Sequence, residues 1–117
     1  MINPRTGDNI WYYPAPKDKV KDILREGISA FGRSTFTGGI HTPWIYLSTQ
    51  PEENKYLEYL AIDTKDIHER CISISQLKSS SGDKLLRVHI QIEPPWIKRI
   101  NDDIREEVDN SANNLGS

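Results

Sequence analysis

The stretch WIYLSTQPEENKYLEYL, residues 44–60, decides the expected fold because its pattern changes from that of a strand to that of a helix. The first five residues, Trp44 to Ser48, are mostly apolar and β-prone, which is typical of a short strand. From Thr49 onward, turn-forming and acidic residues precede apolar residues at helical spacing. The stretch therefore predicts a strand that leads directly into a helix.

Several features of residues 49–60 favour this helix. Thr49 can cap its N-terminus, Pro51 suits its first turn, and the two acidic residues at 52–53 complement the positive end of the helix dipole. The stripe that we expect it to bury consists of Tyr56, Leu57 and Leu60.

Upstream of this stretch, the sequence predicts a strand followed by a second helix. Residues 10–13 are aromatic and β-prone, and we expect Pro14 and Pro16 to end their strand. In the following KDKVKDILREG, apolar residues recur at i, i+3 and i+4, and Gly27 stops the pattern. The apolar positions of this amphipathic helix are Val20, Ile23 and Leu24.

Downstream, CISIS at residues 71–75 alternates as a half-buried strand, and SSSGDK at residues 79–84 is typical of a turn. The next strand alternates most clearly, and the prolines at 94–95 end it. Its apolar side consists of Leu86, Val88, Ile90 and Ile92, and its polar side of Arg87, His89, Gln91 and Glu93. A helical face is expected next, consisting of Trp96, Ile97, Ile100, Ile104 and Val108.

The composition is that of one small polar domain. The 117 residues are enough for a single core, expected within residues 10–108, with a flexible arm at 1–9 and a disordered tail at 109–117. The net charge is −2, from 15 basic and 17 acidic side chains. The excess of basic residues that is typical of proteins that bind the phosphates of nucleic acids is therefore absent. We see no signal peptide and no apolar run near the ~18 residues of a membrane span. We therefore expect a cytoplasmic protein that does not enter a membrane.

Cysteine and histidine usage predicts no metal site. Cys71 is the single cysteine, so no internal disulfide can form and a structural zinc site is not expected. The three histidines lack the spacing of metal ligands. Cys71 begins a β-prone run, which favours burial over a nucleophilic role.

The order of the segments predicts an α+β fold and resembles the first half of the ADP-ribosyltransferase superfamily. That superfamily often shows a tyrosine–histidine pair, a helix of the form I-L-x-x-G-L/I, and a strand reading Y-L-S that is followed by P-E. The resemblance covers residues 10–60 and, to a lesser degree, 85–95. The matching pieces are Tyr12-Tyr13, Ile23 to Ile28, Ile45 to Ser48 and Pro51-Glu52.

The resemblance implies a split, twisted, mainly antiparallel sheet with two to three helices, and a cleft that holds NAD, the substrate, in a bent form. In that superfamily a histidine on the first strand hydrogen-bonds the nicotinamide ribose, and the tyrosine of the Y-L-S strand stacks on the nicotinamide ring. A glutamate steadies the developing oxocarbenium ion. This chemistry needs an oriented glycosidic bond, a negative charge near the anomeric carbon and a dry pocket.

Carried onto this chain, the resemblance assigns a site with one departure from the family pattern. Tyr46 takes the place of the stacking tyrosine and so has a catalytic role as well. Tyr13 stands where the histidine is expected, so a phenol would have to hold the ribose. The residues assigned to NAD binding are Tyr12, Tyr13, Arg33, Tyr46 and Ser48.

The catalytic acid is assigned to Glu93, which ends the polar side of its strand and forms the sequence Q-x-E with Gln91. That form occurs in one branch of the superfamily. The sequence Ile-Glu-Pro at 92–94 also resembles the rifampicin-modifying branch, in which the acid lies further along the chain. In that case the acid would be Asp102 or Asp103, and the two alternatives stay open.

The resemblance implies a mono-ADP-ribosyltransferase that uses NAD and modifies a protein or nucleic-acid target, with a protein favoured. An alternative is a catalytically degenerate module that binds a nucleotide or inhibits a partner protein.

The RNA 2′-phosphotransferase branch relies on basic residues in the cleft, for which Arg33, Arg87 and His89 are available. A last alternative is an unrelated α+β domain in which IYLS is a coincidence. The loop at 29–43 is the expected place for target recognition.

Overall fold

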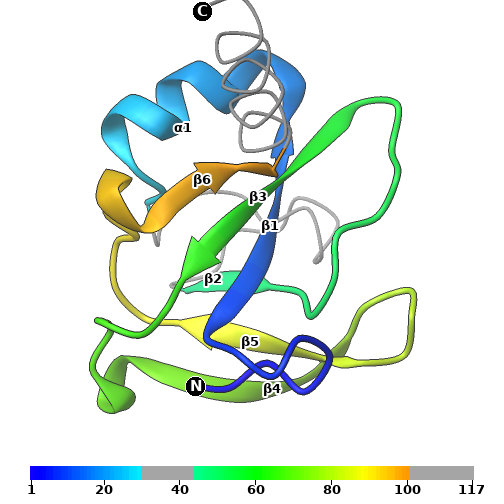
Figure 1. Ribbon diagram of the computed structural model, residues 1–117, viewed down its shortest axis with the longest axis vertical. Coiled ribbons are helices and arrows are strands. Elements are labelled where there is room, and N and C mark those ends of the chain that lie inside the picture. Colours follow the sequence, from blue (N-terminus) through cyan, green and yellow to red (C-terminus); the bar gives the residue numbers. More distant parts are fainter. Residues whose placement is uncertain (30–43, 101–117) are drawn as a thin grey trace, which may run out of the picture.

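Two antiparallel sheets of three strands each, with one short helix, carry the α+β fold of residues 1–29 and 44–100, which are the residues that the computed structural model describes (Figure 1). The first sheet has the order β1-β3-β6, and the second has the order β2-β5-β4. The first comprises β1 (Ile10–Pro16), β3 (Leu57–Asp63) and β6 (Ile97–Arg99). The second comprises β2 (Ile45–Leu47), β5 (Lys84–Val88) and β4 (Ile72–Lys78).

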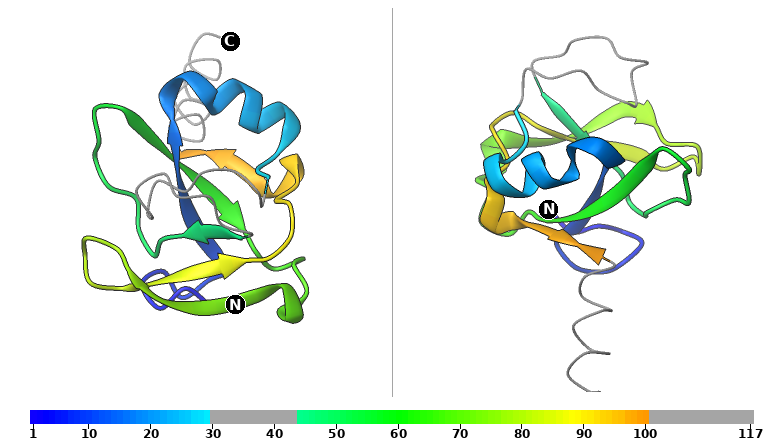
Figure 2. Two further views of the ribbon diagram at one scale, coloured as in Figure 1. Left: turned by 180° about the vertical axis from the view of Figure 1, so that it is seen from behind. Right: turned by 90° about the horizontal axis from the view of Figure 1, so that it is seen from above.

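Short helical segments connect the strands. The α-helix α1 (Val20–Glu26) follows a 3-10 turn at Lys17–Lys19, and further 3-10 turns occupy Glu69–Cys71 and Pro94–Trp96. Helix α1 lies at the opposite end of the domain from β4, as the front and back views agree (Figures 1 and 2). No helix in the described part of the chain has the length and hydrophobicity needed to span a bilayer.

Two backbone bridges tie distant parts of the chain together. Tyr12 and Ser48 exchange both hydrogen bonds, at 2.9 and 2.8 Å, and this antiparallel bridge connects β1 to the residue that follows β2. Ile28, just after α1, pairs in the same way with Ile92, at 2.9 and 3.0 Å. The first bridge joins the two sheets, and the second joins α1 to the segment that leaves β5.

The apolar core receives side chains from both sheets. One face of the first sheet contributes Trp11, Leu60 and Ile62, and one face of the second contributes Leu47 and Val88. All five are at most 1% exposed. Burying side chains of this size contributes roughly 1.5–3 kcal/mol each, so this shared core is the main reason that the two sheets stay together.

The predictions for β2, β4 and α1 are confirmed in type and position. The turn predicted at 79–84 is also confirmed: the amide of Gly82 donates to the carbonyl of Ser79 at 2.9 Å, and Gly82 has a φ of +88°. The prediction that Pro14 ends the first strand is wrong, whereas β1 does end at Pro16. Pro14 is tolerated inside β1 because β1 lies at the edge of its sheet, so its backbone needs fewer hydrogen-bond donors.

The helix predicted over residues 49–60 is wrong. Residues Leu57–Asp63 form strand β3, which pairs with all seven residues of β1. Tyr56, expected in the buried stripe, is 72% exposed, whereas Leu60 is fully buried. The sequence LEYLAID is short enough to fit both periods, and pairing with β1 on one side and β6 on the other favoured the strand.

Two further boundaries differ from the predictions. The strand expected to run to residue 93 ends at Val88, and Ile90 is 36% exposed instead of facing the core. The helix expected from Trp96 onward does not begin there, because Ile97–Arg99 form β6 and pair with β3. Ile104 and Val108 lie outside the described residues.

Gly27 is required where α1 ends. Its φ of +89° and ψ of −171° lie in a backbone region that is essentially restricted to glycine. In addition, a Cβ at this position would overlap the carbonyl oxygen of Ile92, the acceptor of the Ile28 bridge. Gly27 therefore permits both the helix end and the bridge.

We predict that Gly27→Ala lowers the free energy of unfolding by more than about 2 kcal/mol, because it adds backbone strain and a clash with Ile92. Urea unfolding followed by tryptophan fluorescence measures this loss. Gly82→Ala is the matched control, since Gly82 also has a positive φ but a Cβ there meets no atom within 4 Å. Equal losses in the two variants would contradict the role of the Ile92 contact.

Candidate functional site

The second sheet carries a polar face formed by neighbouring strands. Tyr46 of β2 is the register partner of Arg87 of β5, and Arg87 is in turn the partner of Ser73 of β4. Paired residues in an antiparallel sheet point to the same face, and so do residues two apart in a strand. Trp44 and His89, which lie just beyond β2 and β5, contact side chains of this face. We call these five residues the β5 polar cluster: Trp44, Tyr46, Ser73, Arg87 and His89.

The Trp44 ring lies at the centre of the aromatic contacts in the cluster. Its Nε1 donates to the hydroxyl oxygen of Tyr46 at 2.5 Å. The guanidinium carbon of Arg87 lies 4.9 Å from the centre of the indole, and the His89 ring lies 5.5 Å from it at a tilt of 48°. Cation–π and tilted aromatic contacts of this kind are attractive, so the ring holds three side chains in place.

Ser73 links the two basic side chains of the cluster. Nε of Arg87 donates to the Ser73 hydroxyl at 3.2 Å, and the same hydroxyl lies 3.1 Å from Nε2 of His89. A hydroxyl oxygen has two lone pairs, so the Ser73 oxygen can accept from Arg87 and can either donate to Nε2 of His89 or accept from it, depending on the histidine tautomer.

The bridge between Tyr12 and Ser48 extends this face to the first sheet. Since Ser48 is two residues after Tyr46, the bridge places Tyr12, Ser48 and Tyr46 on the same side. The Ser48 hydroxyl donates to the carbonyl of Gln50 at 2.9 Å and is buried with its residue. Tyr46 is only 6% exposed, so a ligand ring can stack on it only by displacing a neighbour.

Tyr13 points away from this face. It follows Tyr12 in β1, so its side chain projects from the opposite side of the strand, where it packs against the hydrophobic core. Burial raises the pKa of the Tyr13 phenol above its ordinary value. Of the tyrosine pair, Tyr12 is therefore the residue that shares a side with Tyr46.

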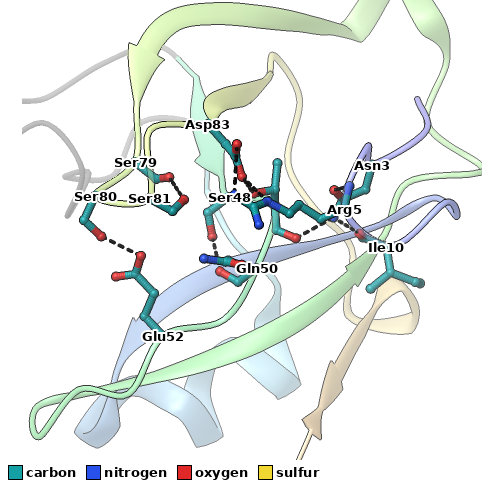
Figure 3. A network of polar contacts seen from close by, with 11 residues as sticks. Asn3, Arg5, Ile10, Ser48, Gln50, Glu52, Ser79, Ser80, Ser81 and Asp83 are labelled. Carbon is teal, nitrogen blue, oxygen red and sulfur yellow. Dashed lines mark hydrogen bonds and ion pairs between the residues drawn. The ribbon is translucent and has the colours of Figure 1, made fainter.

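The first nine residues, expected to form a flexible arm, fold back beside this region (Figure 3). The amide of Asn3, which is fully buried, donates to the carbonyls of Ile10 at 2.8 Å and Thr49 at 2.7 Å. Arg5 forms an ion pair with Asp83 at 2.7 Å, and the Thr49 hydroxyl donates to the same carboxylate at 2.6 Å. These contacts hold the segment that starts at Ser48 against the turn between β4 and β5.

The Asp83 carboxylate is stabilised in its charged form. Hydrogen bonds from Arg5 first, and then from Thr49, hold the pKa of Asp83 below its ordinary value of 3.8. A lowered pKa in the folded state means that the ion pair stabilises the fold at any pH above the unfolded pKa. The stabilisation is then lost as the pH falls through the lower, folded pKa.

We predict that Asp83→Asn makes the protein less stable at about pH 7, and that this deficit shrinks on acidification to about pH 2, where the wild-type carboxylate is also protonated. Urea midpoints measured across this range test the prediction. Asp66→Asn, which changes an exposed carboxylate, is the control. A deficit that stays constant down to the lowest pH would show that the charge of Asp83 is not what holds the turn.

The catalytic candidate Glu93 lies apart from these contacts. It is exposed and sits between the Ile92 bridge and the 3-10 turn at Pro94–Trp96, where its backbone carbonyl accepts from the amide of Trp96 at 3.0 Å. Among the described residues, no hydrogen bond or ion pair joins its carboxylate to Tyr12, Tyr46 or Ser48. Arg33 and the alternative acids Asp102 and Asp103 lie outside the described residues.

A pocket of about 970 Å³ opens elsewhere, between Lys17, the segment 51–55 and the start of β3. Tyr59 and Glu58 line its wall, and its other carboxylates are at 52–53. None of the residues assigned to NAD binding lines this pocket. Within the described residues, no group of three or more His, Cys, Asp or Glu side chains could hold a metal ion.

The site residues that sequence reasoning missed are Trp44 and Ser73, and it considered Arg87 and His89 only for a different activity. A signal was present, because Arg87 and His89 alternate on the polar side of a predicted strand, and Ser73 and Ser75 alternate in CISIS. The grouping itself depends on the register of β4 against β5, which the local pattern does not contain.

The chain matches no protein-family model, no curated protein and no solved structure. The assignment of a function therefore depends on the geometry of the polar face and on the sequence resemblance that assigned its residues.

Proposed function

We propose that the chain is an ADP-ribosyltransferase-like protein that binds NAD on the face shared by Tyr12, Tyr46 and Ser48 and transfers the ADP-ribosyl group to a macromolecular target. One observation carries the proposal. The bridge between Tyr12 and Ser48 gathers on one side three residues that the sequence resemblance assigns to NAD binding, although Tyr12 is far from the other two in the chain. No local pattern joins Tyr12 to Tyr46 and Ser48.

Each residue then has a role set by its position. Tyr12 replaces Tyr13 as the phenol that hydrogen-bonds the nicotinamide ribose, because Tyr13 faces the core. Tyr46 stacks on the nicotinamide ring after Trp44 moves aside, since the two are joined by a hydrogen bond. The Tyr12 hydroxyl and the Tyr46 ring together orient the glycosidic bond of NAD, and this orientation is the main requirement of the reaction.

The reaction itself breaks one bond and forms one bond. The bond from the ribose anomeric carbon to the nicotinamide nitrogen breaks, and nicotinamide leaves with the electron pair. The target nucleophile forms the new bond to the same carbon and releases its proton to solvent or to a carboxylate. The role of stabilising the positive charge that develops on the ribose falls to Glu93, which the sequence resemblance assigns and whose side chain is exposed.

We predict that the purified chain releases nicotinamide from NAD, and that Glu93→Gln lowers kcat by about 10²–10³-fold, because the charge opposite the oxocarbenium ion is removed. Tyr46→Leu should lose activity through the lost stacking, whereas Tyr46→Phe, which keeps the ring, should retain most of it. Nicotinamide release followed by chromatography measures all variants.

Glu69→Gln is the matched control, because Glu69 is also exposed and begins a 3-10 turn, whereas Glu93 directly precedes one. It should behave as the wild type. If Glu93→Gln and Glu69→Gln show the same activity, Glu93 is not the catalytic acid. If the folded wild-type chain releases no nicotinamide, with or without candidate targets, the enzymatic proposal fails.

A second candidate, a nucleotide-binding module without catalysis, is favoured by a specific observation. The tyrosine that stands in the histidine position, Tyr13, packs against the core and is not available to a ligand on the polar face. In that case NAD raises the melting temperature of the chain while no nicotinamide is released. The same samples used for the activity measurement distinguish the two functions.

A further inference from the structure

Tyr59 carries a phenol hydroxyl that has no hydrogen-bond partner within residues 1–29 and 44–100. Only 9% of Tyr59 is exposed. Every fully buried side-chain nitrogen or oxygen of the described ranges has a partner, so the Tyr59 oxygen, which has none, reaches solvent. It does so in the pocket beside β3, because Tyr59 lines that pocket. Buried tyrosines usually satisfy their hydroxyl, so this one is available to a ligand.

The walls of the pocket are fixed by contacts within the fold. The amide of Lys17 donates to the carbonyl of Tyr56 at 3.1 Å, which joins the residue after β1 to the residue before β3. Another wall is the segment 51–55. The Ser80 hydroxyl holds this segment by donating to Oε1 of Glu52 at 2.5 Å (Figure 3). A ligand therefore meets side chains that are already in position.

The Glu52 carboxylate acts on the Tyr59 phenol. Burial first, and then the negative charge of Glu52, raises the pKa of Tyr59 above its ordinary value of 10.0, so the phenol stays protonated at neutral pH. Ser80 uses Oε1 of Glu52, and no other hydrogen bond or ion pair within the described ranges uses Oε2. The pocket thus presents two oxygens, one of a carboxylate and one of a phenol, that can both accept from one donor group.

The other charges that line the pocket are neutralised or exposed. Both oxygens of Glu58 accept from Arg99, at 2.8 and 2.9 Å. Glu53, Lys17 and Lys55 are exposed, so water solvates their charges. The half-buried carboxylate beside the phenol is therefore the charge that a ligand meets with the least competition from water.

We propose that Glu52 and Tyr59 bind the primary ammonium group of an aliphatic amine. An ammonium group has three donors and no acceptor, which matches a site of acceptor oxygens. Pro51, Leu57 and Ile100 also line the pocket and give the alkyl chain an apolar surface to contact. An anionic group is disfavoured at the same place, because the carboxylate of Glu52 repels it.

Two sources can supply the ammonium group, a free amine and the lysine side chain of a peptide. The pocket of about 970 Å³ has room for either. The proposal is separate from the NAD reaction, because none of the residues assigned to NAD binding lines this pocket. Amine binding is therefore measured without NAD, and its outcome does not depend on whether the chain releases nicotinamide.

The test is a titration of the full chain with pentylamine, pentanol, diaminopentane and a lysine blocked at both backbone ends, followed by the backbone NMR signals of residues around the pocket. Pentanol has the same chain without the charge, and we expect pentylamine to bind at least about tenfold more tightly. Tighter binding of the diamine identifies a free amine as the ligand, tighter binding of the blocked lysine identifies a side chain, and equal affinities show that the ammonium alone is recognised. Pentanol binding as tightly as pentylamine, or no binding of any amine, overturns the proposal.

Variants assign the binding to the two residues. Tyr59→Phe removes the hydroxyl, and Glu52→Gln removes the charge while it keeps an oxygen for Ser80. Each should weaken pentylamine binding by about tenfold. Tyr56→Phe is the matched control and should bind as the wild type, because Tyr56 is 72% exposed and does not line the pocket.

Stability separates a ligand-binding hydroxyl from a structural one. Because the Tyr59 hydroxyl has no partner in the described part of the chain, Tyr59→Phe should leave the urea midpoint unchanged. A lower midpoint would mean that the hydroxyl supports the fold, which contradicts the proposal. Wild-type affinity for pentylamine in both folded variants, Tyr59→Phe and Glu52→Gln, would refute the assignment.

Discussion

The pair of backbone hydrogen bonds between Tyr12 and Ser48 is the constraint on which the rest of the arrangement depends. It joins the edge of one sheet to the end of a strand in the other, and it fixes which side chains of the two sheets share a side. Asn3 reinforces it, because its buried amide binds carbonyls on both sides of the junction, at Ile10 and Thr49. Without this junction, Tyr12 and Tyr46 would belong to two separate surfaces.

The pocket beside β3 and the β5 polar cluster present different side chains. The pocket beside β3 is lined by side chains of both charges, because Lys17 and Lys55 lie there with the carboxylates, and Glu58 is paired with Arg99. The β5 polar cluster instead presents Arg87 and His89 beside the Trp44 ring, a combination of donors and a flat apolar surface. The two regions therefore differ in charge and in aromatic content.

Local sequence patterns correctly predicted the elements whose conformation depends mainly on residues that are close in the chain. Helix α1 and its end at Gly27 follow from apolar spacing and glycine geometry, and β2 and β4 follow from β-prone runs. The strand β3 could not be predicted, because its seven residues fit two periods and pairing with β1 and β6 decided between them. For the site, the motif identified Tyr46 and Ser48, whereas the grouping of Ser73 with Arg87 depends on strand register, a long-range property.

The most direct test of the account is an NMR measurement of nuclear Overhauser effects between bound NAD and the tyrosine rings of the full chain. If the Tyr12–Ser48 junction builds the site, the nicotinamide and ribose protons show contacts to the rings of Tyr12 and Tyr46 and none to Tyr13, which faces the core. Contacts to Tyr13, or to Tyr59 in the pocket beside β3, would contradict it, as would a sample saturated with NAD that shows no contact to either Tyr12 or Tyr46.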